Sequence, residues 1–152
     1  MKIVPWLNKD RIIMSMKSEE KREAIKELGS VIRQARAVLD YDKFMKEVFR
    51  REELCTTGIG NEIAIPHART DGVKELIIAI GRSLKGIEFD AIDQKPVKLI
   101  FLLGTPQSAG LNVYLRVLAH LSRMLNNRAF RSELLEAKTP ADIIKAFEAN
   151  ET

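Results

Sequence analysis

Cysteine, histidine and long apolar runs are scarce in this sequence, and each shortage excludes a class of protein. The 152 residues include one cysteine, Cys55, and two histidines. A lone cysteine excludes an internal disulfide and a zinc site built from several cysteines, and it favours a reducing compartment. Two histidines without the spacing of a metal-binding helix predict no metal site, and no motif predicts an organic cofactor.

The apolar stretches are too short to cross a membrane. A membrane-spanning helix needs about 18 consecutive apolar residues, and no stretch approaches that length. The run that begins at Ile3 stops at Leu7, where the polar residues 8–11 follow. A secretory signal needs a longer apolar core. We therefore expect a cytoplasmic protein with no membrane insertion.

Charge of one sign is not concentrated anywhere. The chain has 25 Lys+Arg and 21 Asp+Glu, a formal net charge of +4 and a pI near 9.3. Charges of both signs are interleaved, so the sequence predicts no nucleic-acid partner. An apolar content of 45% with 30% charged residues is typical of a globular protein. The length is typical of one domain, and we expect residues 1–152 to form a single domain.

The apolar periodicity predicts an α/β fold. Two nearly continuous apolar runs, 76–80 and 97–103, are typical of strands buried on both faces. Short strands are expected at 12–16 and 63–65, a loop at 57–61, and helices at 18–35, 40–49, 114–125, 128–136 and 139–147. Strands without a polar face need helices on both sides. We predict a three-layer α/β/α sandwich with a mixed central β-sheet, and not a Rossmann order, because strict β-α alternation is absent.

His67 is the candidate functional residue. It follows Pro66, which cannot donate to a sheet ladder and can therefore end a strand and present the next side chain at the end of the sheet. Neutral imidazole is a good nucleophile near pH 7 and can accept a phosphoryl group directly. The phosphoryl oxygens would need backbone N–H groups, hydroxyls or a guanidinium as partners. The structural alternative is a histidine that makes one hydrogen bond at a strand end.

Other chemistry-bearing residues have simpler interpretations. Gly58 and Gly60 do not form a nucleotide loop, because such a loop follows a strand and opens a helix, and a tight turn is expected instead. His120 lies opposite the apolar stripe of its predicted helix and is expected to be a solvated surface residue. Cys55 is expected to be structural.

Residues 51–67, REELCTTGIGNEIAIPH, resemble the signature of the IIA proteins of the bacterial phosphoenolpyruvate:sugar phosphotransferase system, fructose/mannitol type. Residues 89–97, followed by an apolar strand, are similar to the nitrogen-regulatory branch of that family. The order of expected elements matches the family from about residue 8 to residue 149. The resemblance implies an α/β/α sandwich with a mixed sheet, in agreement with the periodicity.

The resemblance also implies a set of site residues. His67 matches the family's phosphorylated histidine, and Arg51 matches an arginine that neutralises phosphoryl charge. Family members often carry a second histidine at the start of the long helix, where this chain has Tyr114, a hydrogen-bond donor that is not a cation near neutral pH. Glu62 is expected to point away from the phosphoryl group. The segment that matches the lining of the site consists of Thr57, Gly58, Ile59, Gly60 and Asn61.

The resemblance implies a phosphocarrier with a phosphohistidine intermediate and no cofactor. The donor would be the small carrier protein HPr or its nitrogen-branch counterpart. Tyr114 and the nitrogen-branch likeness favour a regulatory role, with a transporter or sensor kinase as partner. A first alternative is a sugar-specific IIA component that passes the phosphoryl group to a IIB cysteine for sugar uptake. A second is a non-catalytic regulatory binding module, and exposed helices could support a homodimer.

Overall fold

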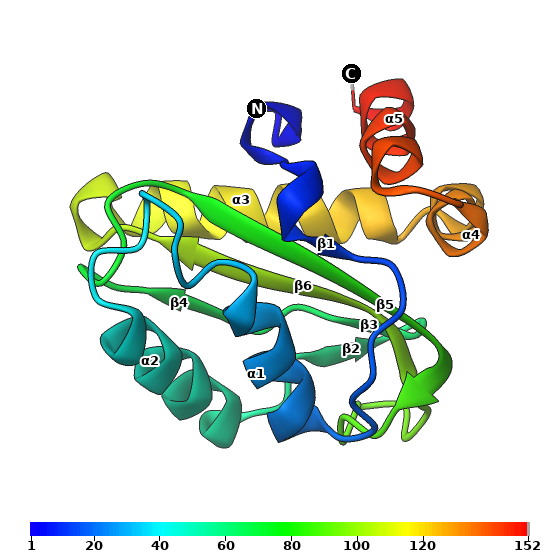
Figure 1. Ribbon diagram of the computed structural model, residues 1–152, viewed down its shortest axis with the longest axis horizontal. Helices are drawn as coiled ribbons and strands as arrows, with labels where there is room; N and C mark the ends of the chain where they lie inside the picture. The colour runs from blue at the N-terminus through cyan, green and yellow to red at the C-terminus, as the bar shows by residue number, and fades with distance from the viewer. Residues whose placement is uncertain (152) are drawn as a thin grey trace.

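The computed structural model describes residues 1–151, and its centre is a six-stranded mixed sheet (Figure 1). The strand order is β1-β5-β6-β3-β2, and β4 also pairs with β6. The long central pair, β5 and β6, is antiparallel, whereas β1 runs parallel to β5, and β3 and β4 run parallel to β6. The strands are β1 (Ile12–Ile13), β2 (Gly58–Gly60), β3 (Ile63–Ala64), β4 (His67–Arg69), β5 (Ile77–Ile87) and β6 (Val97–Thr105).

Helices cover both faces of this sheet (Figure 1). One face carries α1 (Lys21–Ser30) and α2 (Tyr41–Leu54), and the other carries α3 (Leu111–Leu125), α4 (Arg128–Glu136) and α5 (Pro140–Asn150). Three short 3-10 turns are η1 (Val4–Trp6), η2 (Lys9–Arg11) and η3 (Gln107–Ala109). The predicted three-layer α/β/α sandwich with a mixed sheet is confirmed. None of the helices within residues 1–151 combines the length and apolar composition that a membrane crossing requires.

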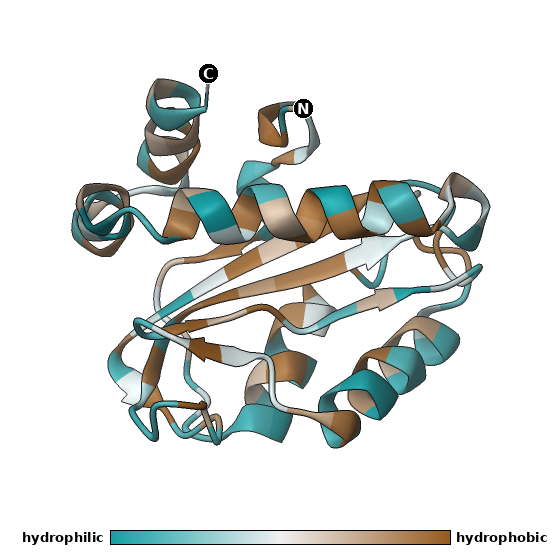
Figure 2. Cartoon of the chain, turned by 180° about the vertical axis from the view of Figure 1, so that it is seen from behind, coloured by the Kyte–Doolittle hydropathy of each residue, from teal (hydrophilic) through white to brown (hydrophobic). Residues whose placement is uncertain are grey.

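The two apolar runs of the sequence divide their side chains between two cores. Successive side chains of a strand point to opposite faces of the sheet. Ile100 and Leu102 of β6 therefore join the core under α1 and α2. Leu99, Phe101 and Leu103 join the core under α3, α4 and α5. In Figure 2 the strands are predominantly brown, between helices that turn teal residues outward.

Pro66 separates β3 from β4 without changing their neighbour. Ile63 and Ala64 pair with Leu99 and Ile100, and the next pairs along β6 begin at His67 with Leu103. Pro66 has no N–H to donate, but its carbonyl accepts a hydrogen bond from the Leu103 N–H at 3.0 Å. The strand is interrupted at Ile65 and Pro66, and His67 begins a new strand that pairs further along β6.

Several predicted bounds are wrong: the strand expected at 12–16 covers Ile12–Ile13, and the helix expected at 18–35 ends at Ser30. Helix α1 begins at Lys21 with Glu20 as its N-cap, and not at Ser18. The Glu27 carboxylate accepts from the N–H groups of Lys17 and Ser18 and from the Ser18 hydroxyl at 2.6 Å, which holds Ser18 outside the helix. The stretch 57–61 is not only a loop, because Gly58–Gly60 forms β2, antiparallel to β3. A Cβ at Gly58 would lie 2.7 Å from the Ala91 Cα, so only glycine fits this close approach.

Candidate functional site

His67 opens β4 with its ring largely covered and one nitrogen already bonded. The residue is 8% exposed, and Nδ1 lies 2.6 Å from the carbonyl oxygen of Ile65. A carbonyl oxygen only accepts hydrogen bonds, so Nδ1 carries the proton and the Nε2 lone pair is free. Burial lowers the pKa of His67 below its ordinary value of 6.5, and the bond to Ile65 partly opposes this shift. The ring is therefore neutral near pH 7, as a nucleophile must be.

Tyr114 lies against this imidazole. The two ring centroids are 5.5 Å apart with an interplanar angle of 53°. Tyr114 belongs to the first turn of α3, whereas His67 comes from the sheet. Burial raises the pKa of the Tyr114 phenol above 10.0, so its hydroxyl remains a hydrogen-bond donor at neutral pH. The structure thus brings together two residues, 47 positions apart, that the resemblance associates.

Two arginines flank the pair. Arg51, near the end of α2, donates from Nη1 to the Cys55 carbonyl at 2.8 Å, and its positive charge lowers the pKa values of both His67 and Tyr114. Arg69 lies two residues after His67 on β4. Its positive charge also lowers the pKa of Tyr114, against the larger rise that burial causes. Both arginines line one hollow of about 240 Å³, together with Tyr114. Sequence reasoning missed Arg69, although its spacing of two from His67 on a strand was a usable signal.

A buried carboxylate holds the segment that precedes β2. Glu52 of α2, 6% exposed, accepts from the Thr57 N–H at 2.8 Å and from the Thr57 hydroxyl at 2.5 Å. Lys21, the first residue of α1, pairs with the same carboxylate at 3.0 Å. The Thr57 carbonyl then accepts from the N–H of Ile65, whose own carbonyl holds His67. The Thr57 hydroxyl proton is therefore engaged with Glu52. Thr57 supports the site indirectly, because it bonds to the residue that holds the His67 ring.

Residues 59–61 of the predicted lining segment lie away from His67. Gly60 pairs with Ile63, which is level with Leu99 on β6, whereas His67 is level with Leu103. A separation of four residues along a strand is about 13 Å. Gly60 and the preceding and following residues, Ile59 and Asn61, line a separate hollow of about 410 Å³ against the C-terminal half of α3. The expectation that Ile59, Gly60 and Asn61 bind the phosphoryl group thus finds no support, because β2 runs away from His67. Gly58 stays level with Ala64 and is buried.

Glu62 behaves as expected. It lies at the turn between β2 and β3, with φ 67°, and its carboxylate pairs with Lys98 at 3.2 Å. The same strand register that places Asn61 far from His67 also places Glu62 far from it. Its negative charge is therefore neutralised at the far end of β3 and does not oppose an anion at His67.

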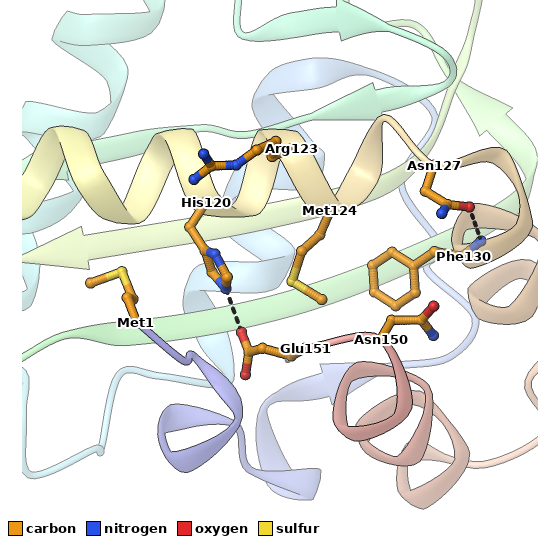
Figure 3. Close-up of a pocket in the computed structure, with 8 residues that line it drawn as sticks. All are labelled: Met1, His120, Arg123, Met124, Asn127, Phe130, Asn150 and Glu151. Atoms are coloured by element: carbon orange, nitrogen blue, oxygen red, sulfur yellow. Dashed lines mark hydrogen bonds and ion pairs between the residues drawn. The ribbon is translucent and has the colours of Figure 1, made fainter.

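The prediction for His120 is wrong, and Figure 3 shows why. His120 projects from α3 into a hollow of about 440 Å³, where Nε2 lies 2.6 Å from the Glu151 carboxylate. The Glu151 side chain is fully buried and also accepts from the N–H groups of Ile3 and Val4. This side of α3 faces solvent in an isolated helix, but the N-terminal segment and the end of α5 cover it. Glu151 therefore links the end of the chain to the N-terminal segment and to His120 of α3.

The groups around His67 are those that acceptance of a phosphoryl group requires. A neutral imidazole with a free Nε2 can act as a nucleophile, guanidinium groups can stabilise negative charge, and a phenol can donate a hydrogen bond. Within residues 1–151, no group of three or more His, Cys, Asp or Glu side chains is placed to hold a metal ion.

Comparison with known proteins agrees with this class. Residues 6–150 match the family described as phosphoenolpyruvate-dependent sugar phosphotransferase system, EIIA 2. The chain belongs to this family, which confirms the resemblance carried by residues 51–67.

Both branches of the family occur among its relatives. The chain is 41% identical over 119 residues to a fructose-specific EIIA component of Haloferax volcanii, covering 78% of this chain and 77% of that one. It is 36% identical over 144 residues to a fructose-specific EIIABC component of Bacillus subtilis, covering 95% of this chain and only 22% of that protein. The crystal structure of nitrogen regulatory protein IIA-Ntr from Neisseria meningitidis superimposes with a TM-score of 0.87 at 30% identity, over 95% of this chain and 98% of that one.

Proposed function

We propose that the protein is a phosphocarrier that accepts a phosphoryl group on Nε2 of His67 from a phosphohistidine of an HPr-like carrier protein. The observation that carries the proposal is the 2.6 Å contact between Nδ1 and the Ile65 carbonyl. This contact places the ring proton on Nδ1 and leaves the lone pair on Nε2, at the other side of the imidazole. A structural histidine would need only one bond, but it would not need a neighbouring pair of arginines.

The chemistry is a transfer between two imidazoles. The Nε2 lone pair of His67 attacks phosphorus as the nitrogen–phosphorus bond of the donor breaks, and that bonding electron pair returns to the donor imidazole. The proton on Nδ1 stays in its bond to Ile65, so His67 carries a formal positive charge next to the bound phosphoryl group. Arg51 offsets the charge on the phosphoryl oxygens, and the Tyr114 hydroxyl donates to one of them.

A transfer assay tests the proposal. Radiolabelled phosphoenolpyruvate, the general phosphotransferase and the carrier are incubated with the protein, and label on the protein is measured over time. We expect wild type to be labelled and His67→Gln to take no label. The chain supplies its own control, because His120→Gln removes the other histidine, and it should still be labelled if circular dichroism shows it folded. Labelling of His67→Gln at the wild-type rate would refute the proposal.

The destination of the phosphoryl group separates two roles. We propose regulation as the first, because Tyr114 stands where the resemblance expects a second histidine and because the nitrogen regulatory structure superimposes closely. Onward transfer to a IIB cysteine for sugar uptake is the second, favoured by the identity of 41% to a fructose-specific EIIA component. Label that leaves His67 for a IIB cysteine within seconds supports uptake. Label that stays on His67, with a transporter or sensor kinase retained in only one phosphorylation state, supports regulation.

Both roles would operate in the cytoplasm. Cys55 is exposed and unpaired in the described residues, which suits a reducing compartment. Detection of the chain in a cytoplasmic fraction of its source cells is the corresponding test.

A further inference from the structure

Arg69 has an orientation that follows from the register of β4. Ala68 belongs to the core under α1 and α2, so its neighbours His67 and Arg69 point to the α3 side of the sheet. Nη1 of Arg69 donates to the Gln107 carbonyl at 3.1 Å, in the turn that leads into α3. The side chain is half-buried, and a guanidinium has five N–H donors, so this single bond leaves donors to spare.

The hollow beside His67 has an excess of positive charge. Its lining includes Glu47, Arg50, Arg51 and Arg69. The carboxylate of Glu47 pairs with Arg50 at 3.5 Å. Within residues 1–151, neither Arg51 nor Arg69 has a carboxylate within salt-bridge distance. Two uncompensated guanidinium groups match the charge of about −1.5 to −2 that a phosphoryl group carries at pH 7.

We propose that Arg69 is a second phosphoryl-binding residue, which holds the phosphoryl group on His67 together with Arg51 and Tyr114. The inference rests on the proposed function and deepens it, since the family resemblance assigns only one arginine to the site. It also explains how the site works with Tyr114, which supplies a hydrogen bond but no positive charge. Arg69 supplies that charge from the sheet.

The test compares two arginines of the same hollow. Arg69→Gln removes the proposed contact, and Arg50→Gln is the matched control, because Arg50 is already paired with Glu47. Single-turnover labelling by the phosphorylated carrier is measured for wild type and both variants. One charge-assisted hydrogen bond contributes about 10- to 100-fold to such a step. We therefore expect Arg69→Gln to be labelled about 10- to 100-fold more slowly than wild type, and Arg50→Gln to stay within about twofold.

A second measurement separates phosphoryl binding from structural support. The ionisation of the phosphoryl group on the labelled protein is followed by phosphorus NMR as the pH is varied. A guanidinium in contact with the group favours its dianion, so Arg69→Gln should raise the pKa of the phosphoryl group, whereas Arg50→Gln should not. Arg69→Lys keeps the charge but loses the two-pronged geometry, and it should be labelled several-fold more slowly than wild type.

The outcomes are distinct. If wild type takes no label, the proposed function fails, and the role of Arg69 fails with it. If wild type is labelled and Arg69→Gln matches Arg50→Gln in both measurements, the proposed function survives and the inference is overturned. If Arg69→Gln does not fold, the labelling rate of Arg69→Lys decides, because a wild-type rate without the two-pronged geometry would overturn the inference.

Discussion

Replacement of the buried Glu52 by glutamine is the most informative perturbation of the site's support. The carboxylate accepts two hydrogen bonds from Thr57, at 2.8 and 2.5 Å, and pairs with Lys21 at 3.0 Å. A glutamine has one acceptor oxygen, so it can retain the bond from the Thr57 N–H. The glutamine side chain cannot neutralise Lys21. Its NH₂ group is a donor in the place of the carboxylate oxygen that accepts from the Thr57 hydroxyl.

The expected loss follows from these contacts. Hydrogen bonds to a charged group contribute about 1.5–3 kcal/mol each, and the exposure of Lys21 (24%) reduces the value of the ion pair. We expect Glu52→Gln to lower the free energy of unfolding by about 2–3 kcal/mol. For a chain of this size, each kcal/mol corresponds to about 2–4 °C, so Tm should fall by about 4–12 °C.

Urea unfolding followed by circular dichroism measures this difference. Glu53→Gln is the control, because Glu53 is the next residue of the same helix and is exposed. It should change the free energy of unfolding by less than about 0.5 kcal/mol. The negative charge of Glu52 also raises the pKa of His67, so NMR titration of Glu52→Gln should show a lower pKa for that ring. Equal unfolding midpoints for the two variants would refute the reasoning.

Three further predictions concern buried ionisable groups. Arg82 is 8% exposed and donates to the carbonyls of four residues, three of them at the end of α4, so Arg82→Met should cost about 2–4 kcal/mol and speed hydrogen exchange in α4, with Arg82→Lys intermediate. Glu151→Gln should cost about 1–2 kcal/mol and expose the N-terminal segment to proteolysis, and undiminished protease resistance would contradict the bonds to Ile3 and Val4. Burial lowers the pKa of His67 in the folded state, so the unfolded chain binds that proton more tightly and stability should fall as pH drops through 6.5 towards the folded pKa. His67→Gln should lose that part of the pH dependence, which urea titrations at several pH values would reveal.

The strand and helix content of the protein could be predicted because the spacing of apolar residues along the chain reflects which side chains are buried. The run 97–103 is apolar at every position except Lys98, because both faces of β6 are covered. One core takes Ile100 and Leu102, and the other takes Leu99 and Phe101. Asp40 and Thr139 cap helices through their own side chains, a local interaction that needs no tertiary contact. Ser18 does not cap α1, because the Glu27 carboxylate accepts from the N–H groups of Lys17 and Ser18 and from the Ser18 hydroxyl and holds this segment outside the helix.

The sequence by itself determined the α/β/α layers and the place of His67 after Pro66, since both depend on local patterns of apolar residues and backbone donors. Only the tertiary structure decided which polar side chains meet. It placed Tyr114 against the imidazole and in one hollow with Arg51 and Arg69. It also moved Asn61 to the other end of β3 and set His120 against Glu151. The physical reason is that a polar side chain's partner depends on strand register and helix docking, which bring together residues far apart in the chain, and periodicity within one element carries no information about either.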